Sequence, residues 1–176
     1  MAKIGVLVGF ICLAVIGSNR GIDSSIIKEE TGYEKVIRIA AKEIGVVEGA
    51  VENDGARISQ YLAYCNIKSP APWCAAYLSF CFGQAGYKQP RTAWSPALFP
   101  ASRLVKEPKP GCVFGIYFNA LGRVAHCGIV AKLHGNNVYT IEGNTSVAGS
   151  REGDGVHARV RHRRTIYCYA DWIMRI

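Results

Sequence analysis

Apolar residues recur at helical spacing in three stretches of the N-terminal half of the chain. In residues 33–44 they lie three and four positions apart, with charged residues on the opposite face. Residues 56–64 repeat this pattern. A third apolar stretch begins at Trp73, directly after two prolines that favour extended backbone, and runs to about Gln84. The pattern therefore predicts three helices, the last of which opens at Cys74.

From Pro108 onward the pattern changes to short runs rich in Val, Ile and Tyr, separated by Gly and Asn. Five strands are predicted, over residues 112–118, 124–133, 138–142, 156–166 and 167–173. The stretch before them, residues 87–104, is irregular and aromatic. Helices followed by consecutive short strands are typical of an α+β fold, with N-terminal helices packed on a C-terminal antiparallel β-sheet.

The N-terminus has its own pattern. After Lys3, residues 4–17 form an uncharged apolar run that is too short for a membrane span of about 20 residues. A basic start, such a run and small residues at its end describe a signal peptide. We expect residues 1–20 to be a signal peptide or a weak membrane anchor, 21–32 a linker and 33–176 the folded domain. A buried N-terminal element is the alternative.

Composition narrows the class of protein. The 176 residues are 49% hydrophobic and 19% charged, which indicates one globular domain rather than a disordered chain. The formal charge of +8 suits an anionic partner such as nucleic acid, a membrane surface or a wall polymer. No nucleic-acid-binding motif accompanies the charge, so we expect no nucleic-acid partner. The strongest basic cluster is either a polyanion site or a solvated strand face and comprises Arg159, Arg161, His162, Arg163 and Arg164.

Three separated positions predict nucleophilic chemistry. Cys74 opens the third helix, where unpaired N–H groups and the helix dipole lower a thiol pKa. His126 lies on a predicted strand, and Glu142 and Asn144 lie at the end of the next one. A cysteine, a histidine and an orienting carboxylate or amide form a nucleophile–base–orienter set. Either Glu142 or Asn144 could orient the imidazole, and we favour Glu142 because a carboxylate stabilises the imidazolium better.

The other cysteines and histidines have less distinctive positions. His134 lies in a predicted turn, whereas His157 and His162 lie in the basic cluster. No Cys/His pair has zinc spacing, so we expect no metal and no cofactor. Alternation along a strand places Cys127 on the opposite side from His126, which makes it a core residue. We expect the remaining cysteines to be mostly buried free thiols.

Three short motifs resemble those of the CHAP family of cysteine amidohydrolases, which belongs to the larger NlpC-like, papain-related group. They are residues 73–80 (WCAAYLSF), 126–130 (HCGIV) and 142–144 (EGN), and the similarity extends from about Tyr33 to the C-terminus. The resemblance implies a papain-like or NlpC-like core with Cys74 as nucleophile and His126 as base. It also implies that Glu142 and Asn144 supply the orienting groups.

The same resemblance implies peptidoglycan as the substrate. The chain would act as an N-acetylmuramoyl-L-alanine amidase or a peptidoglycan endopeptidase. Trp73 and Trp94 could bind substrate along a groove, with residues 87–104 as one wall, or residues 87–104 could be a loop held to the core by its aromatic residues. We expect a monomer that is secreted or periplasmic, or is membrane-anchored, with transient membrane association through residues 4–17. Two alternatives are a catalytically silent wall- or polyanion-binding module and a related cysteine acyltransferase or protein peptidase.

Overall fold

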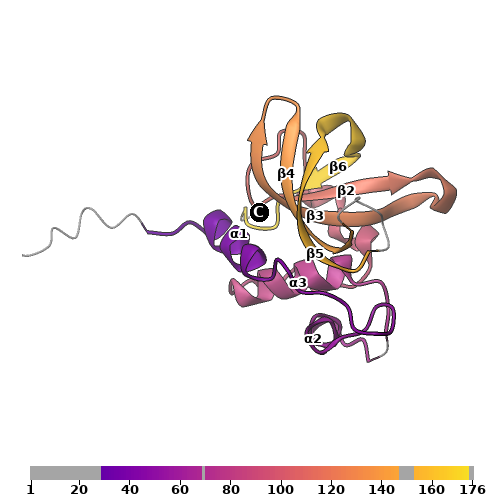
Figure 1. Cartoon of the computed structure of the whole chain (residues 1–176). Coiled ribbons are helices and arrows are strands. Elements are labelled where there is room, and N and C mark those ends of the chain that lie inside the picture. Colours follow the sequence, from indigo (N-terminus) through magenta and orange to yellow (C-terminus); the bar gives the residue numbers. More distant parts are fainter. Residues whose placement is uncertain (1–28, 69, 147–152, 175–176) are drawn as a thin grey trace, which may run out of the picture.

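The computed structural model describes residues 29–68, 70–146 and 153–174. The predictions for the signal peptide or anchor, and for most of the linker, therefore lie outside the described residues. Within them, no helix is both long and apolar enough to cross a bilayer. The described residues form a helical layer and a sheet (Figure 1).

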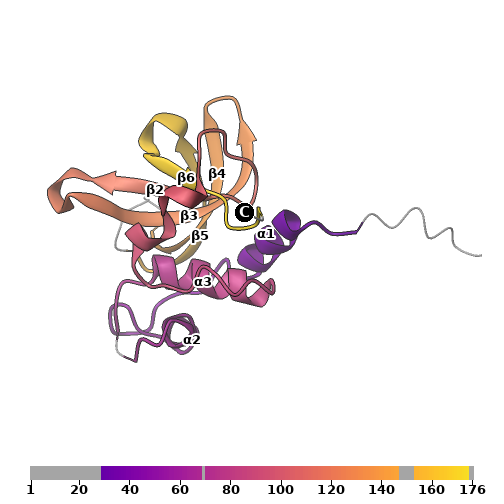
Figure 2. The same cartoon turned by 180° about the vertical axis from the view of Figure 1, so that it is seen from behind.

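The predicted helices are present with nearly the expected bounds: α1 (Gly32–Lys42), α2 (Ala56–Tyr64) and α3 (Cys74–Gln84). α1 begins with a capping box in which Thr31 and Glu34 each accept a backbone N–H of the other. α3 lies between α2 and the sheet in both views (Figures 1 and 2), and it also packs against α1. This central position explains why every residue from Cys74 to Phe82 is buried.

The strands form one antiparallel sheet in the order β1-β6-β2-β3-β4-β5. Their bounds are β1 (Leu104–Val105), β2 (Val113–Phe118), β3 (Arg123–His134), β4 (Asn137–Thr145), β5 (Gly155–His162) and β6 (Cys168–Ala170). The α+β prediction is confirmed, with three helices on a six-stranded sheet. Only five strands were predicted, because a two-residue edge strand such as β1 is too short to show alternation.

Two predicted strands are longer than the observed ones. β5 ends at His162, and Arg163–Thr165 forms a 3-10 turn instead of continuing the strand. β6 is limited to three residues near the start of the predicted run. The irregular aromatic region contains two further 3-10 turns, Ser95–Leu98 and Ala101–Arg103. The first turn contacts both α3 and β3, so it reaches the point where helix and sheet meet.

The two faces of the sheet have separate cores. The helix-facing side contributes Val113, Cys127, Ile129 and Ile141 to a large cluster with α3. The opposite side has a smaller cluster made by Cys112, Phe114, Val130, Val138 and Tyr169. The main core therefore fixes α3 against β3 and β4, the two strands that carry the predicted histidine and carboxylate.

Candidate active site

Cys74 is the first residue of α3, and Trp73 is the helix N-cap. The Cys74 side chain is only 4% exposed, yet it lines a pocket of about 210 Å³. A helix leaves its first N–H groups without intrahelical partners, and its dipole is positive at this end. The thiol is therefore placed where the fold favours an anion.

His126 and Glu142 form a buried pair on neighbouring strands. The imidazole Nε2 lies 2.8 Å from Glu142 Oε2, and both side chains are almost completely inaccessible to solvent. Because a carboxylate only accepts, Nε2 carries the proton of this bond. The other ring nitrogen, Nδ1, is buried and has no hydrogen-bond partner among the described residues. Nδ1 is thus the ring nitrogen that Glu142 does not engage. The favoured prediction, Glu142 rather than Asn144 at the imidazole, agrees with this geometry.

Glu142 is held by two further side chains. Arg161 on β5 donates from Nε to Oε1 at 2.7 Å and from Nη2 to Oε2, and Thr140 donates to Oε1. Gly128, two residues after His126, leaves room for the carboxylate, because a Cβ at Gly128 would approach Glu142 Cγ to 2.8 Å. The Phe114 ring would be closer still, at 2.6 Å, so the glycine of the HCGIV motif is explained by the space that Phe114 and Glu142 need.

The pKa values of the buried groups are shifted by their neighbours. Although burial alone would raise the pKa of Glu142, the hydrogen bonds from Arg161 and His126 lower it to about 2. Burial opposes the imidazolium, but the interactions with Cys74 and Glu142 raise the pKa of His126 to about 9. The thiol of Cys127, followed by the imidazole of His126, holds the pKa of Cys74 well below its ordinary value despite burial. The site therefore favours a thiolate–imidazolium pair.

Two residues that sequence reasoning did not assign to the site complete the surroundings of the thiol. Ser95 Oγ lies 3.4 Å from Cys74 Sγ and 3.9 Å from Cys127 Sγ, so its hydroxyl contacts both thiols. Cys127 is a core residue as predicted. Burial raises the pKa of the Cys127 thiol, and so does the adjacent Cys74. Cys127 thus stays protonated and can donate to the Cys74 thiolate.

Asn144 makes no hydrogen bond to the imidazole and instead supports the start of α3. With its amide oriented to match donors with acceptors, Oδ1 accepts the Trp73 N–H at 3.1 Å and Nδ2 donates to the Gly153 carbonyl at 3.0 Å. Asn144 has φ 53°, a left-handed conformation that asparagine tolerates better than most residues. Between Glu142 and Asn144, a Cβ at Gly143 would approach the Trp73 ring to 2.7 Å. In the EGN motif, Glu142 therefore bonds the imidazole, Gly143 allows the Trp73 ring to pack closely, and Asn144 holds the start of α3.

The two tryptophans have different positions. The Trp73 indole is fully buried against Tyr61 and Tyr77, and its Nε1 donates to Glu48 at 2.7 Å. The prediction that Trp73 lines a substrate groove is therefore corrected, because a core side chain presents no face to a ligand. Trp94 is 54% exposed and lies at the rim of the Cys74 pocket. Its role in substrate binding stays a prediction.

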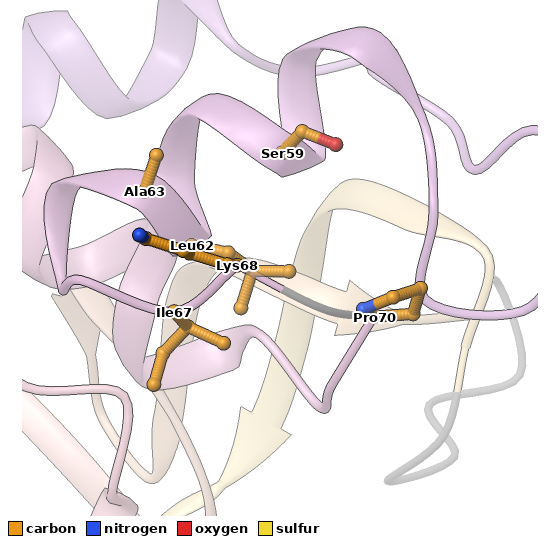
Figure 3. Close-up of a pocket in the computed structure, with 6 residues that line it drawn as sticks. All are labelled: Ser59, Leu62, Ala63, Ile67, Lys68 and Pro70. Carbon is orange, nitrogen blue, oxygen red and sulfur yellow. The ribbon is translucent and has the colours of Figure 1, made fainter.

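The Cys74 pocket is mostly apolar. Besides Cys74, Ser95, Trp94 and Arg123, its lining consists of Ile67, Ala71, Pro72, Ala93 and Ala125. A second pocket, of about 290 Å³, lies beside α2 and is also lined by Ile67 (Figure 3). Its lining contains Ser59 and Lys68 but none of the predicted catalytic residues. The pocket at Cys74 is therefore the relevant one for thiol chemistry.

The basic cluster on β5 is partly engaged within the protein. Arg161 bonds Glu142, and Arg163 lies 3.1 Å from Glu107. His162 caps the 3-10 turn by accepting the Arg164 N–H. The cluster is thus neither a uniformly solvated face nor an uninterrupted polyanion site. Sequence alone could not show this, because the contact of Arg161 with Glu142 depends on how β5 pairs with β4.

The six cysteines of the described residues are all free thiols. Over the same residues, no group of three His, Cys, Asp or Glu side chains is placed to hold a metal ion. His157 pairs with Asp154 at 3.0 Å near the surface.

Comparison with known proteins adds no relative. No protein-family model matches the chain, and no curated protein matches it either.

Proposed function

We propose that the chain is a cysteine amidohydrolase that cleaves an amide bond of peptidoglycan. The observation that carries the proposal is the buried set Cys74–His126–Glu142, in which a helix-terminal thiol of lowered pKa adjoins an imidazole held by a carboxylate. Burial alone raises the pKa of a thiol that only packs in a core. A buried thiol of lowered pKa beside an imidazole is therefore not needed for packing. The helix-on-sheet placement of the three groups also supports a papain-like or NlpC-like core.

In the proposed reaction, the Cys74 thiolate attacks the amide carbonyl carbon and forms a tetrahedral intermediate. His126, which holds the thiol proton, gives it to the leaving nitrogen as the C–N bond breaks. Water then attacks the resulting thioester while His126 takes its proton, and the thiol is regenerated with release of a carboxylic acid. Glu142 keeps the imidazole oriented and stabilises its cation throughout.

The backbone around Cys74 supplies the electrostatic help that the intermediate requires. The N–H of Cys74 is in the first turn of α3 and lacks an intrahelical acceptor, so it can donate to the developing oxyanion. The preceding N–H, that of Trp73, already donates to Asn144 Oδ1. The two roles are therefore separated along the helix start.

Peptidoglycan is proposed from the motif resemblance and from charge. A net charge of +8 favours binding to the anionic polymers of a bacterial wall. Cleavage at the glycan–peptide amide and cleavage within the peptide would use the same catalytic groups. We propose a monomer exported from the cell, either released or held by its N-terminal segment.

Zymography of wild type and Cys74→Ala on wall-containing gels tests the proposal. Clearing by wild type alone is expected, whereas a silent binding module clears in neither form. Masses of the products from purified muropeptides then distinguish the amidase from the endopeptidase. A protein peptidase would cut unfolded protein and leave muropeptides intact, and an acyltransferase would yield products extended by an added amine.

The N-terminal segment is proposed to be dispensable for folding. Deleting residues 2–20 is expected to leave a folded, active protein, measured by circular dichroism and wall clearing. Loss of folding on that deletion would show instead that the apolar run belongs to the core.

A further inference from the structure

The Cys74 pocket has one charged side chain at its rim. Arg123 begins β3, three residues before His126, and its guanidinium lies 4.2 Å above the ring of Trp94. Its Nη1 also donates to the Val124 carbonyl at 3.2 Å. Stacking and this bond restrict the guanidinium, so it is already positioned before any ligand arrives.

Arg123 has no acidic partner among the described residues, in contrast to Arg57 and Arg161. Arg57 bonds Glu43 and Arg161 bonds Glu142, whereas no carboxylate of the described residues lies within ion-pair distance of Arg123. An arginine carries five N–H donors in a planar fork that matches a carboxylate. At Arg123 most of these donors remain available, beside a pocket that contains the nucleophile.

We propose that Arg123 and Trp94 form a subsite for a substrate carboxylate next to the scissile amide. The substrate would be a peptide with a free carboxylate on a residue adjoining the cleaved bond, and the apolar part of the pocket would take an apolar side chain. The pocket has a volume of about 210 Å³, and its lining includes Ile67, Pro72 and Ala125. That a substrate bound at this subsite is cleaved rests on the proposed function. The binding of an anion by Arg123 and Trp94 does not.

Alkylation of Cys74 tests the subsite without any wall substrate. Iodoacetate carries a carboxylate and iodoacetamide is its neutral analogue, so the ratio of their rates at Cys74 reports the attraction of an anion. At low ionic strength, where screening is weak, Arg123→Met is expected to lower this ratio several-fold, and Arg123→Lys to keep most of it. The rates are measured at Cys74 by peptide mass spectrometry.

Arg91→Met is the matched control. Arg91 also stacks on an aromatic ring, at 4.8 Å from the Tyr64 ring centre, but it does not line the Cys74 pocket. Arg91→Met removes the same charge from the protein as Arg123→Met does. Because Arg91 does not line the pocket, this variant should leave the ratio of the two alkylation rates unchanged. Equal ratios in wild type, Arg123→Met and Arg91→Met would overturn the proposal. If Arg123→Met does not fold, Arg123→Gln is measured in its place, with the same expectation.

A second experiment compares a muropeptide whose carboxylate is free with its carboxamide. Wild type should cleave the free acid with a higher kcat/KM, by about tenfold or more for a charge-assisted hydrogen bond, and Arg123→Met should lose this preference mainly through KM. No cleavage of either compound, with the alkylation ratio still dependent on Arg123, would refute the proposed function and support the anion subsite. Equal cleavage of both by wild type would refute the carboxylate subsite alone.

Discussion

Cys74 and Cys81 lie on the same helix, two turns apart, and both are buried, yet their acidities shift in opposite directions. Burial raises the pKa of the Cys81 thiol, and the neighbouring Tyr77 hydroxyl does not offset it. The pKa of Cys74 is lowered, because Cys127, His126 and Ser95 surround its sulfur at the end of the helix that favours an anion. Burial is thus common to both thiols, and the side chains supplied by the sheet and the Ser95 turn make the difference.

The largest difference between Cys74 and Cys81 is expected when each thiol is removed in turn. Cys74→Ala should abolish wall cleavage, because no other group can form the thioester. Cys81→Ala should keep activity and cost about 1 kcal/mol of folding free energy, as a small cavity in the core does. Cleavage assays and thermal unfolding of both variants provide the measurement. Activity in Cys74→Ala, or its loss in a folded Cys81→Ala, would contradict the assignment.

Alkylation at mildly acidic pH should separate the two thiols next. Only a thiolate reacts readily, so iodoacetamide at pH 6 should label Cys74 in the folded protein while Cys81 stays unmodified. The expected selectivity is about 100-fold or more, since an ordinary thiol of pKa about 8.5 is less than about one part in a hundred ionised there. Peptide mapping after quenching measures the ratio, and urea-unfolded protein, in which both should react alike, is the control.

Much of this comparison was predictable from the sequence. The two prolines and the apolar spacing placed Cys74 at a helix start, and strand alternation placed His126 and Glu142 on adjacent strands. The partners of Arg161 and Ser95 were not predictable, because they depend on strand pairing and on a 3-10 turn in a stretch without periodicity. The prediction that Trp73 binds substrate was wrong, because an aromatic residue next to a nucleophile in the sequence can equally be buried in the core. Cys127 was correctly placed in the core, but its contact with Cys74 requires the packing of α3 on β3.

Changes around Glu142 should alter the charge of the imidazole rather than the thiol. Glu142→Gln replaces a charge-assisted bond by a neutral one, which corresponds to a loss of about 10- to 100-fold in kcat/KM. Since the carboxylate helps to raise the pKa of His126 to about 9, the alkaline limb of the pH profile should move to lower pH. Arg161→Met should move it to higher pH, because removing a nearby cation favours the imidazolium.

Opposite displacements of the two alkaline limbs are the critical result, measured as kcat/KM between pH 5 and 10 with circular dichroism as the check on folding. Displacement in the same direction would mean that both variants act by loosening the fold. Arg159→Met is the matched control for Arg161→Met, since Arg159 is on the same strand but makes no bond to Glu142. It should leave both limbs in place.

The smallest expected effect concerns Cys127, whose thiol helps to lower the pKa of Cys74. Cys127→Ala removes this donor, so the pKa of Cys74 should rise and the acid limb of the profile should move to higher pH. Because the thiolate–imidazolium pair forms as pH rises through the pKa of Cys74, activity should fall at mildly acidic pH and stay near wild type on the plateau. Cys127→Ser keeps a hydroxyl donor of similar size and should restore the limb. If alanine and serine variants give the same profile, the thiol acts only by filling the core, and Ser95 and His126 alone distinguish Cys74 from Cys81.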